Sequence, residues 1–276
     1  MGLLDIFRRK KKKPAEAPAA NTEETQATVE TVDEVQAADS DVAATPVVGA
    51  EEAQPPVTDP SEVSTVGWDA IDAEFLRVYP GQTKPLHYGT LVKWIFGGND
   101  PLDGISIYDG GDFYHFVTFG LTELYEKQSR NTKLSGYGYE MTLKLKKEGL
   151  GDEEAEIRNM CGILQTIARI TFTKNECFFP NEYIYTGQTV GMDANQKSQI
   201  TGFIVVTDPT VQTLETFNGQ VEFRELVGVT DAELKTLISH EETVEGFYEK
   251  LGSDVTDYQR ESIVQNPEEP VEDSDT

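Results

Sequence analysis

Histidine is the side chain most often used as a general acid or base near neutral pH, and this chain contains three of them. They are His87, His115 and His240, and none lies in an HExxH, HxH or Cys/His pattern or near a GxSxG nucleophile elbow. His115 stands in the strand-like run DFYHFVTFG, where we expect a structural, hydrogen-bonded histidine. The alternative is a hydrolase that uses His115 with a nearby carboxylate, although no motif supplies its nucleophile.

Three further pairs of residues could in principle carry chemistry: the carboxylates Asp100 and Asp103, the glycines Gly136 and Gly138, and the thiols Cys161 and Cys177. The carboxylates lie in NDPLD, which lacks the DxDxDG pattern of a calcium loop and is typical of a turn. The glycines form neither GxGxxG nor GxxxxGK[ST] and indicate a bulge. The cysteines lack CxxC spacing and indicate buried thiols. We therefore expect no catalytic residue, no metal and no cofactor.

Residues 85–147 contain four runs rich in β-branched and aromatic residues, separated by Gly, Asn, Asp or Pro. They predict strands over Thr90–Phe96, Gly104–Tyr108, Phe113–Phe119 and Tyr139–Lys147. The last run alternates, with Met141, Leu143 and Leu145 on one face and Thr142, Lys144 and Lys146 on the other. This pattern predicts a strand with one buried face and one face in water.

Apolar residues at helical spacing predict helices over Val66–Tyr79, Asp152–Ile170 and Thr243–Leu251, and Thr230 with Glu233 predicts a capping box at the start of another. The extended runs Ile200–Val206, Thr213–Phe217 and Val221–Val227 predict strands, the last two joined at Asn218-Gly219. Together these elements predict an α+β fold, a mixed and largely antiparallel sheet with helices packed on it.

Five segments, in this order, resemble the Suppressor of fused (SUFU) domain family: GGNDPLDGISIY, HFVTFGLTELY, SGYGYEMTLKLKKE, FIVVTDP and FNGQVEFRELVGVTDAEL. The resemblance covers about Trp68 to Leu251 and implies a fold like the N-terminal domain of that family. It also implies a non-catalytic protein-binding module. Eukaryotic members restrain a zinc-finger transcription factor by gripping a short peptide, and bacterial members include immunity proteins that neutralise toxin domains.

The resemblance also implies where a partner binds. The tyrosine that matches Tyr125 lies near the peptide-binding cleft of the eukaryotic relatives, and an acidic partner-contacting position is replaced here near Thr132. That departure argues against the eukaryotic peptide specificity. From the residues alone, the competing interpretation of Tyr125 is a half-buried core tyrosine.

The net charge of −26 makes direct nucleic-acid binding unfavourable. Composition divides the chain into an apolar and basic segment (1–13), an acidic linker expected to be disordered (14–64), the SUFU-like domain (65–252) and an acidic tail expected to be disordered (253–276). The apolar residues of the first segment precede its basic cluster, which is the reverse of a secretory signal. The expected location is therefore cytoplasmic.

Two functions from different classes follow. The first is a protein-binding module that serves as an immunity protein. The second is an adaptor tethered peripherally at the inner membrane surface, in which the basic cluster contacts anionic lipid; the cluster comprises Arg8, Arg9, Lys10, Lys11, Lys12 and Lys13. The identity of the protein partner does not follow from the sequence.

Overall fold

The computed structural model describes residues 8–9 and 64–264, apart from the side chains of Arg8, Arg9 and Ile95. These residues belong to one compact unit of the chain. The predicted linker at 14–64 falls outside the described residues except for Ser64, and so do most of the segment 1–13 and the end of the tail. Their predicted disorder stays a prediction.

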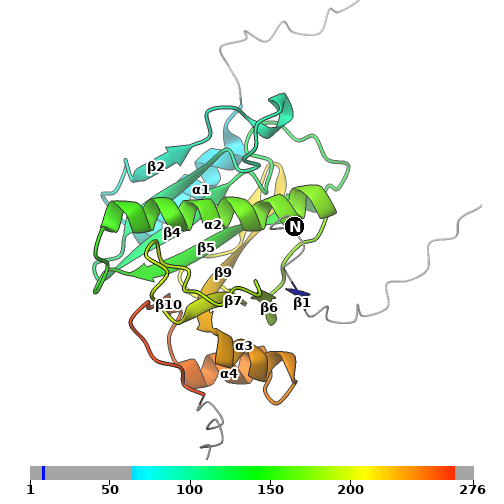
Figure 1. The fold of residues 1–276 in the computed structure, drawn as a ribbon. Helices are drawn as coiled ribbons and strands as arrows, with labels where there is room; N and C mark the ends of the chain where they lie inside the picture. Colours follow the sequence, from blue (N-terminus) through cyan, green and yellow to red (C-terminus); the bar gives the residue numbers. More distant parts are fainter. Residues whose placement is uncertain (1–7, 10–63, 265–276) are drawn as a thin grey trace, which may run out of the picture. The chain divides into compact units, whose positions relative to one another are not determined.

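The described strands form one ten-stranded mixed sheet in the order β1-β6-β7-β9-β5-β4-β3-β2, to which β8 adds beside β9 and β10 beside β5 (Figure 1). Their bounds are β1 Arg8–Arg9, β2 Leu86–Gly89, β3 Gly104–Asp109, β4 Phe113–Phe119, β5 Leu134–Lys146, β6 Glu182–Tyr185, β7 Ile200–Thr207, β8 Leu214–Thr216, β9 Gly219–Thr230 and β10 Val255–Thr256. Only the β5–β9 and β5–β10 pairs are parallel.

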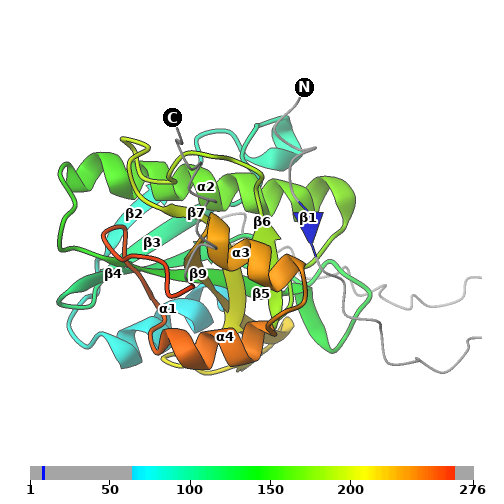
Figure 2. The ribbon, with the colours of Figure 1, turned by 60° about the horizontal axis from the view of Figure 1, so that its bottom comes forward.

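Helices cover both faces of this sheet. They are α1 (Val66–Val78), α2 (Glu153–Lys174), α3 (Asp231–Ile238) and α4 (Val244–Leu251). Figure 2 shows α2 above the sheet and α1 and α4 below it. The predicted α+β class is therefore confirmed, as are the capping box of Thr230 with Glu233 and the end of α4 at Gly252.

Alternation along the strands divides the core between the two faces. On β6 and β7, Ile184, Phe203 and Val205 pack in the cluster beneath α2. Tyr183 and Ile204 point the other way, into the cluster beneath α3 and α4. A third cluster joins α1 to β4 and β9. A sheet buried on both sides cannot bind through a broad face, which leaves its edges and loops for function.

The prediction that one face of β5 is exposed to solvent is wrong. Thr142 and Lys144 are 0% and 2% exposed, because α1 and the segment after α4 cover that face. Lys146 remains partly exposed. Alternating polar residues here indicate a buried polar network and not a solvent-facing side.

The prediction of a strand over Thr90–Phe96 is also wrong. The strand in this region is β2, which ends at Gly89, and Trp94–Phe96 form a 3-10 turn closed by Gly97 in the left-handed conformation. Leu91, Val92 and Phe96 are exposed. The apolar and β-branched residues of this segment have the composition of a strand, but they form an exposed turn.

The chain beyond Gly252 does not leave the domain at once. Val255 and Thr256 pair with Lys144 and Leu145 as β10, and Thr256 is fully buried. Arg260 forms an ion pair with the buried Glu233. The described fold therefore reaches Val264, twelve residues past the predicted domain boundary at 252.

Candidate functional site: the Tyr125 groove

Tyr125 lies half-buried in the loop between β4 and β5, where it lines a cavity of about 210 Å³. The cavity, called here the Tyr125 groove, is bounded by this loop, by the turn after β2 and by the end of α2. The lining side chains used below are Lys93, Trp94, Asp103, Glu123, Tyr125 and Phe172. Three segments that are far apart in the sequence thus form one site.

Lys93 joins two walls of the groove. Its Nζ donates hydrogen bonds of 2.9 Å to the Tyr125 hydroxyl and to Oδ2 of Asp103, and it lies 4.3 Å from the centre of the Tyr125 ring. Partial burial alone would lower the pKa of Lys93, but these hydrogen bonds outweigh burial and raise the pKa. The groove therefore presents a fixed positive charge beside a carboxylate and an aromatic ring.

Glu123 holds the Tyr125 loop in shape. Its carboxylate accepts hydrogen bonds from Nζ of Lys127 at 2.8 Å, from the backbone N–H of Gln128 and Ser129, and from the N–H of Gly136 at 3.1 Å. Burial alone would raise the pKa of Glu123, but these donors outweigh it and lower the pKa to about 2. A carboxylate that is ionised at neutral pH thus organises the loop from its centre.

The base of the loop is fixed from β5. Glu140 is fully buried, and it accepts hydrogen bonds from the hydroxyl groups of Thr118 and Thr122 and from the N–H groups of Gly120 and Thr122. Gly136 has a φ of +54°, and a Cβ there would lie 2.7 Å from the Leu121 carbonyl oxygen. The glycine therefore permits close approach of two backbones, as a bulge at this strand requires.

The β8–β9 turn supports the loop from the other side. Nδ2 of Asn218 donates to the carbonyl oxygens of Glu123 and Tyr125 at 2.8 and 2.9 Å, and Nζ of Lys127 donates to the carbonyl oxygens of Leu134 and Asn218. Asn218 is 1% exposed. The Tyr125 groove is thus held before any ligand arrives, which lowers the entropic cost of binding.

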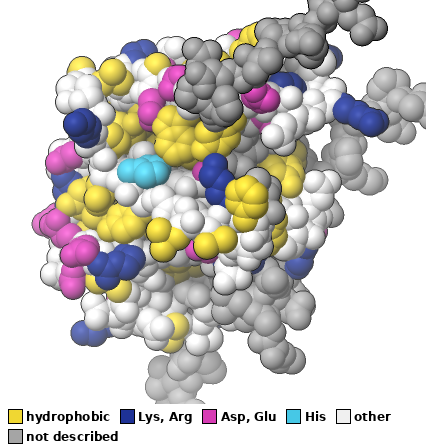
Figure 3. Space-filling view, turned by 90° about the horizontal axis from the view of Figure 1, so that it is seen from above, with side chains coloured by type: hydrophobic (Ala, Val, Ile, Leu, Met, Phe, Trp, Pro, Cys, Tyr) yellow, Lys and Arg dark blue, Asp and Glu magenta, His cyan; other side chains and the backbone are white. Residues whose placement is uncertain are grey.

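Apolar side chains border the groove. Trp94 packs edge-on against Phe172 with ring centroids 6.0 Å apart. Phe96, in the same turn as Trp94, is 76% exposed, and Leu91 and Val92, which precede the turn and line a separate cavity, are 101% and 54% exposed. The side of the molecule that is uppermost in Figure 1 carries clustered hydrophobic side chains (Figure 3). Exposed apolar residues grouped beside a preformed groove are typical of a protein-interaction surface.

The structure separates the two residues that the sequence singled out. Tyr125 lines the groove and also packs against the cluster beneath α1, so its two interpretations are not exclusive. Thr132 is exposed in the loop before β5 and does not line the cavity. No local sequence pattern indicated that Lys93, Asp103 or Phe172 belongs to a binding site. The sequence indicates only that Asp103 lies in a turn.

His115 belongs to a buried polar network and not to an open cleft. It is 0% exposed, its Nε2 lies 3.0 Å from Oδ2 of Asp208, and its Nδ1 lies 2.7 Å from the Tyr79 hydroxyl. Burial lowers the pKa of His115, so the neutral ring donates to Asp208 and accepts from Tyr79. The expected hydrogen-bonded strand histidine is confirmed.

The same network contains charges that the sequence did not reveal as buried. Lys144 Nζ lies 3.5 Å from Asp208, 3.1 Å from Glu225 and 2.6 Å from Asp254. Glu225 is 0% exposed and its Oε1 has no hydrogen-bond partner. Among the described residues, no group of three or more His, Cys, Asp or Glu side chains has metal-binding geometry. We assign this network to stability.

Comparison with known proteins gives a consistent result. The family model for the Suppressor of fused protein (SUFU) matches residues 98–261. The human and mouse Suppressor of fused homologs are each 31% identical to this chain over 181 residues. The alignment covers 61% of this chain and 36% of each homolog, so the chain spans well under half the length of these relatives.

Solved structures agree with the sequence match. The crystal structure of a Sufu–Fu complex is similar with a TM-score of 0.61 and 26% identity, over 72% of this chain and 92% of that one. Drosophila Suppressor of Fused is similar with a TM-score of 0.59 and 26% identity, over 74% of this chain and 53% of that one. Both similarities support the α+β fold described above.

Proposed function

Since the chain belongs to the Suppressor of fused family, we propose that it binds a short segment of a partner protein in the Tyr125 groove. The observation that carries the proposal is the groove itself, which is rigidly held and lined by the Lys93–Tyr125–Asp103 contact, and whose lining residue Trp94 lies in the same turn as exposed Phe96. The similar Sufu–Fu structure, a complex with a protein, supports binding of protein by this fold.

The chemistry of the groove defines the partner segment. Trp94 and Phe172 offer aromatic surface for an apolar side chain. Lys93 offers a hydrogen-bond donor and Asp103 an acceptor, but the two form an ion pair with each other. A polar group of the partner can therefore bind Lys93 only by replacing Asp103, or bind Asp103 only by replacing Lys93. An extended segment with one apolar anchor and a neighbouring polar side chain satisfies both requirements.

The finer proposal is that the partner is a toxin domain and this chain its immunity protein. It rests on the family resemblance and predicts stoichiometric binding with no turnover. A captured partner that is toxic when produced alone, and harmless when produced with this chain at equal amounts, supports that role. A partner without toxicity contradicts the immunity role and leaves the binding module intact.

Membrane contact is the second candidate, favoured by the basic cluster from Arg8 to Lys13 that follows apolar residues. Among the described helices none is long and apolar enough to cross a bilayer. Flotation of the full chain with anionic vesicles tests peripheral contact. Unchanged flotation after all six basic residues are replaced by glutamine contradicts it.

Affinity capture from native cytosol tests the binding function. Full-length wild type, Tyr125→Ala and Tyr248→Ala serve as baits, because both tyrosines are half-buried and only Tyr125 lines the groove. We expect Tyr125→Ala, but not Tyr248→Ala, to capture at least tenfold less partner than wild type. A tenfold loss of affinity corresponds to about 1.4 kcal/mol of binding free energy. Equal capture by the two variants contradicts the groove, and a collapsed melting temperature for Tyr125→Ala marks it as a core residue.

A further inference from the structure

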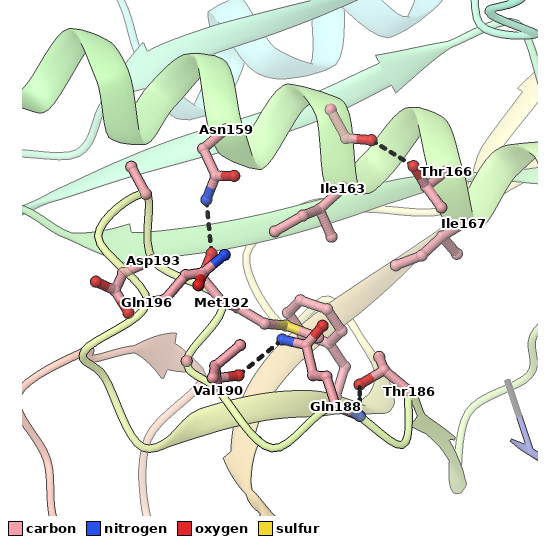
Figure 4. Close-up of a pocket in the computed structure, with 14 residues that line it drawn as sticks. Asn159, Ile163, Thr166, Ile167, Thr186, Gln188, Val190, Met192, Asp193 and Gln196 are labelled. Atoms are coloured by element: carbon pink, nitrogen blue, oxygen red, sulfur yellow. Dashed lines mark hydrogen bonds between the residues drawn. The ribbon is translucent and has the colours of Figure 1, made fainter. Parts of the chain in front are cut away.

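A second cavity lies on another part of the molecule, between α2 and the segment from Thr186 to Gln196 (Figure 4). Its volume is about 330 Å³. Ile163 and Ile167 point into it from α2, and Met192 and Phe203 line it from the opposite side. Gly162 contributes no side chain, and a Cβ built there would meet nothing within 4 Å. The cavity is therefore open, apolar at its centre and roomy.

The rim of this cavity carries no free charge. Asp193 is the one ionisable residue in its lining, and its two oxygens already accept from the N–H groups of Lys197 and Ser198 at 3.0 and 2.6 Å. The other polar groups are neutral amides and hydroxyls. Asn159 ties the segment to α2 by donating to the Met192 carbonyl oxygen at 2.6 Å. The site suits an uncharged apolar group.

The strand β1 indicates which group is available. Arg8 and Arg9 pair antiparallel with Tyr185 and Ile184 at the outer edge of β6. If this register continued by one residue, it would set Phe7 opposite Thr186, which lines the cavity. Side chains alternate between faces along a strand. Ile184 packs beneath α2, and Tyr185 packs on the other face of the sheet. By this alternation, the side chains of Thr186 and of a residue paired opposite it would lie on the face that α2 covers.

We propose that this cavity is the docking site for the chain's own N-terminal segment, with the Phe7 ring as its occupant. The apolar cluster Leu3, Leu4, Ile6 and Phe7 lies immediately before β1 in the sequence, and β1 pairs with the strand that leads into the cavity lining. An apolar cavity of roughly 150 Å³ already holds a benzene molecule, so 330 Å³ accommodates a phenyl ring.

This docking assigns a role to the N-terminus that neither the groove nor the basic cluster provides. It anchors the segment before β1 to the edge of the sheet and shields the backbone of β6 from pairing with other strands. Apolar side chains seated there cannot insert into a bilayer at the same time. The inference does not depend on the Tyr125 groove, because the two cavities share no lining residue.

Methyl NMR of the full chain tests the proposal, with labelled isoleucine and methionine methyl groups and protonated phenylalanine rings. We expect nuclear Overhauser contacts from the Phe7 ring to the methyl groups of Ile163, Ile167 and Met192. Phe7→Ala should abolish these contacts and shift the three methyl signals. Phe217→Ala removes an exposed phenylalanine on the β8–β9 turn, and it should leave them unchanged.

A second variant tests the cavity without touching the N-terminus. Gly162→Leu places a side chain in the open space and favours the helix, so the fold is retained while the Phe7 contacts are lost. Gly151→Leu is the matched control, because Gly151 also has open space and does not line the cavity. Absence of Phe7 contacts in wild type overturns the proposal. So do contacts that arise only between differently labelled chains, since the occupant is then a second copy.

Discussion

Lys144 and Lys146 lie two residues apart on the same face of β5, but only Lys144 is buried. Its ammonium group lies among Asp208, Glu225 and Asp254, and these acidic partners raise the pKa of Lys144 although burial opposes them. Lys146 pairs with Asp257 and Glu148 and is 32% exposed. Removing a buried partner leaves uncompensated charges, whereas an exposed pair contributes little.

The pair of lysines gives a direct comparison. Lys144→Met should lower the free energy of unfolding by about 3–5 kcal/mol, because it leaves Asp208 and Asp254 without their counter-charge. Lys146→Met should cost less than about 1 kcal/mol. Urea unfolding followed by circular dichroism measures both. Similar losses for the two variants would contradict the burial of Lys144.

Glu225 is the least satisfied member of the network. Burial raises the pKa of Glu225 well above its ordinary value, and Asp208 adds to the effect, while Lys144 opposes it. A carboxyl that stays protonated in the fold but ionises in the unfolded chain stabilises the protein fully below the unfolded pKa of about 4.3. That contribution is lost as the pH rises toward the folded pKa.

Glu225→Gln, which cannot ionise, should therefore change the pH dependence of stability. The variant should gain free energy of unfolding relative to wild type, and the gain should grow from pH 5 to pH 8. Denaturant titrations of both proteins across this range measure the difference. A gain that is constant with pH, or that shrinks as the pH rises, would show that Glu225 is ionised in the fold.

At the scale of elements, β10 shows how the segment after α4 completes the sheet. The N–H of Gly228 on β9 donates to Oγ1 of the buried Thr256 at 2.9 Å. A Cβ at Gly228 would lie 2.5 Å from Cγ2 of Thr256 and 2.8 Å from Cγ2 of Ile200. The glycine is therefore required by the close packing of β10 and β7 against β9.

Gly228→Ala should destabilise the fold by about 1–3 kcal/mol, because its methyl group overpacks this contact. Thr256→Ser removes the clashing Cγ2 and keeps the hydroxyl, so the double variant should recover part of the loss. Thermal unfolding of the four proteins forms a double-mutant cycle. Purely additive losses would indicate that β10 does not pack on Gly228.

The elements that could be predicted from the sequence are those with local signals. The β8–β9 hairpin, the capping box at Thr230 and the apolar stripe of α2 each depend on neighbouring residues, although the hairpin loop is Phe217-Asn218, one residue before the predicted Asn218-Gly219. The exposed turn at Leu91–Phe96 and the return of β10 depend on contacts with remote segments. No local pattern encodes them.

The candidate site divides in the same way. Tyr125 was found through a family resemblance, and the structure places it in the groove. Lys93 lies 32 residues before Tyr125 in the sequence, and Phe172 lies 47 residues after it. No pattern in the sequence indicates that segments so far apart meet at the groove. The burial of Lys144 was missed because its strand alternates like one with a solvated face.

At the scale of the whole molecule, both faces of the sheet are covered, so binding is left to its margins. The Tyr125 groove lies beside the exposed turn after the edge strand β2, and β1 occupies the opposite edge at β6. Loops and edges carried on a rigid core are where binding sites usually lie. We therefore expect a partner on the β2 side of the sheet.

Site-specific photocrosslinking tests whether a partner binds at the Tyr125 groove. A benzophenone amino acid replaces exposed Phe96, in the turn that contributes Trp94 to the groove, or, as a control, exposed Ile263 near the end of the described residues, and the proteins are irradiated in a native cell extract. Binding at the Tyr125 groove predicts one abundant protein adduct from position 96 and none from 263. Adducts of the same protein from 263 alone, or equally from both positions, would contradict binding at the Tyr125 groove.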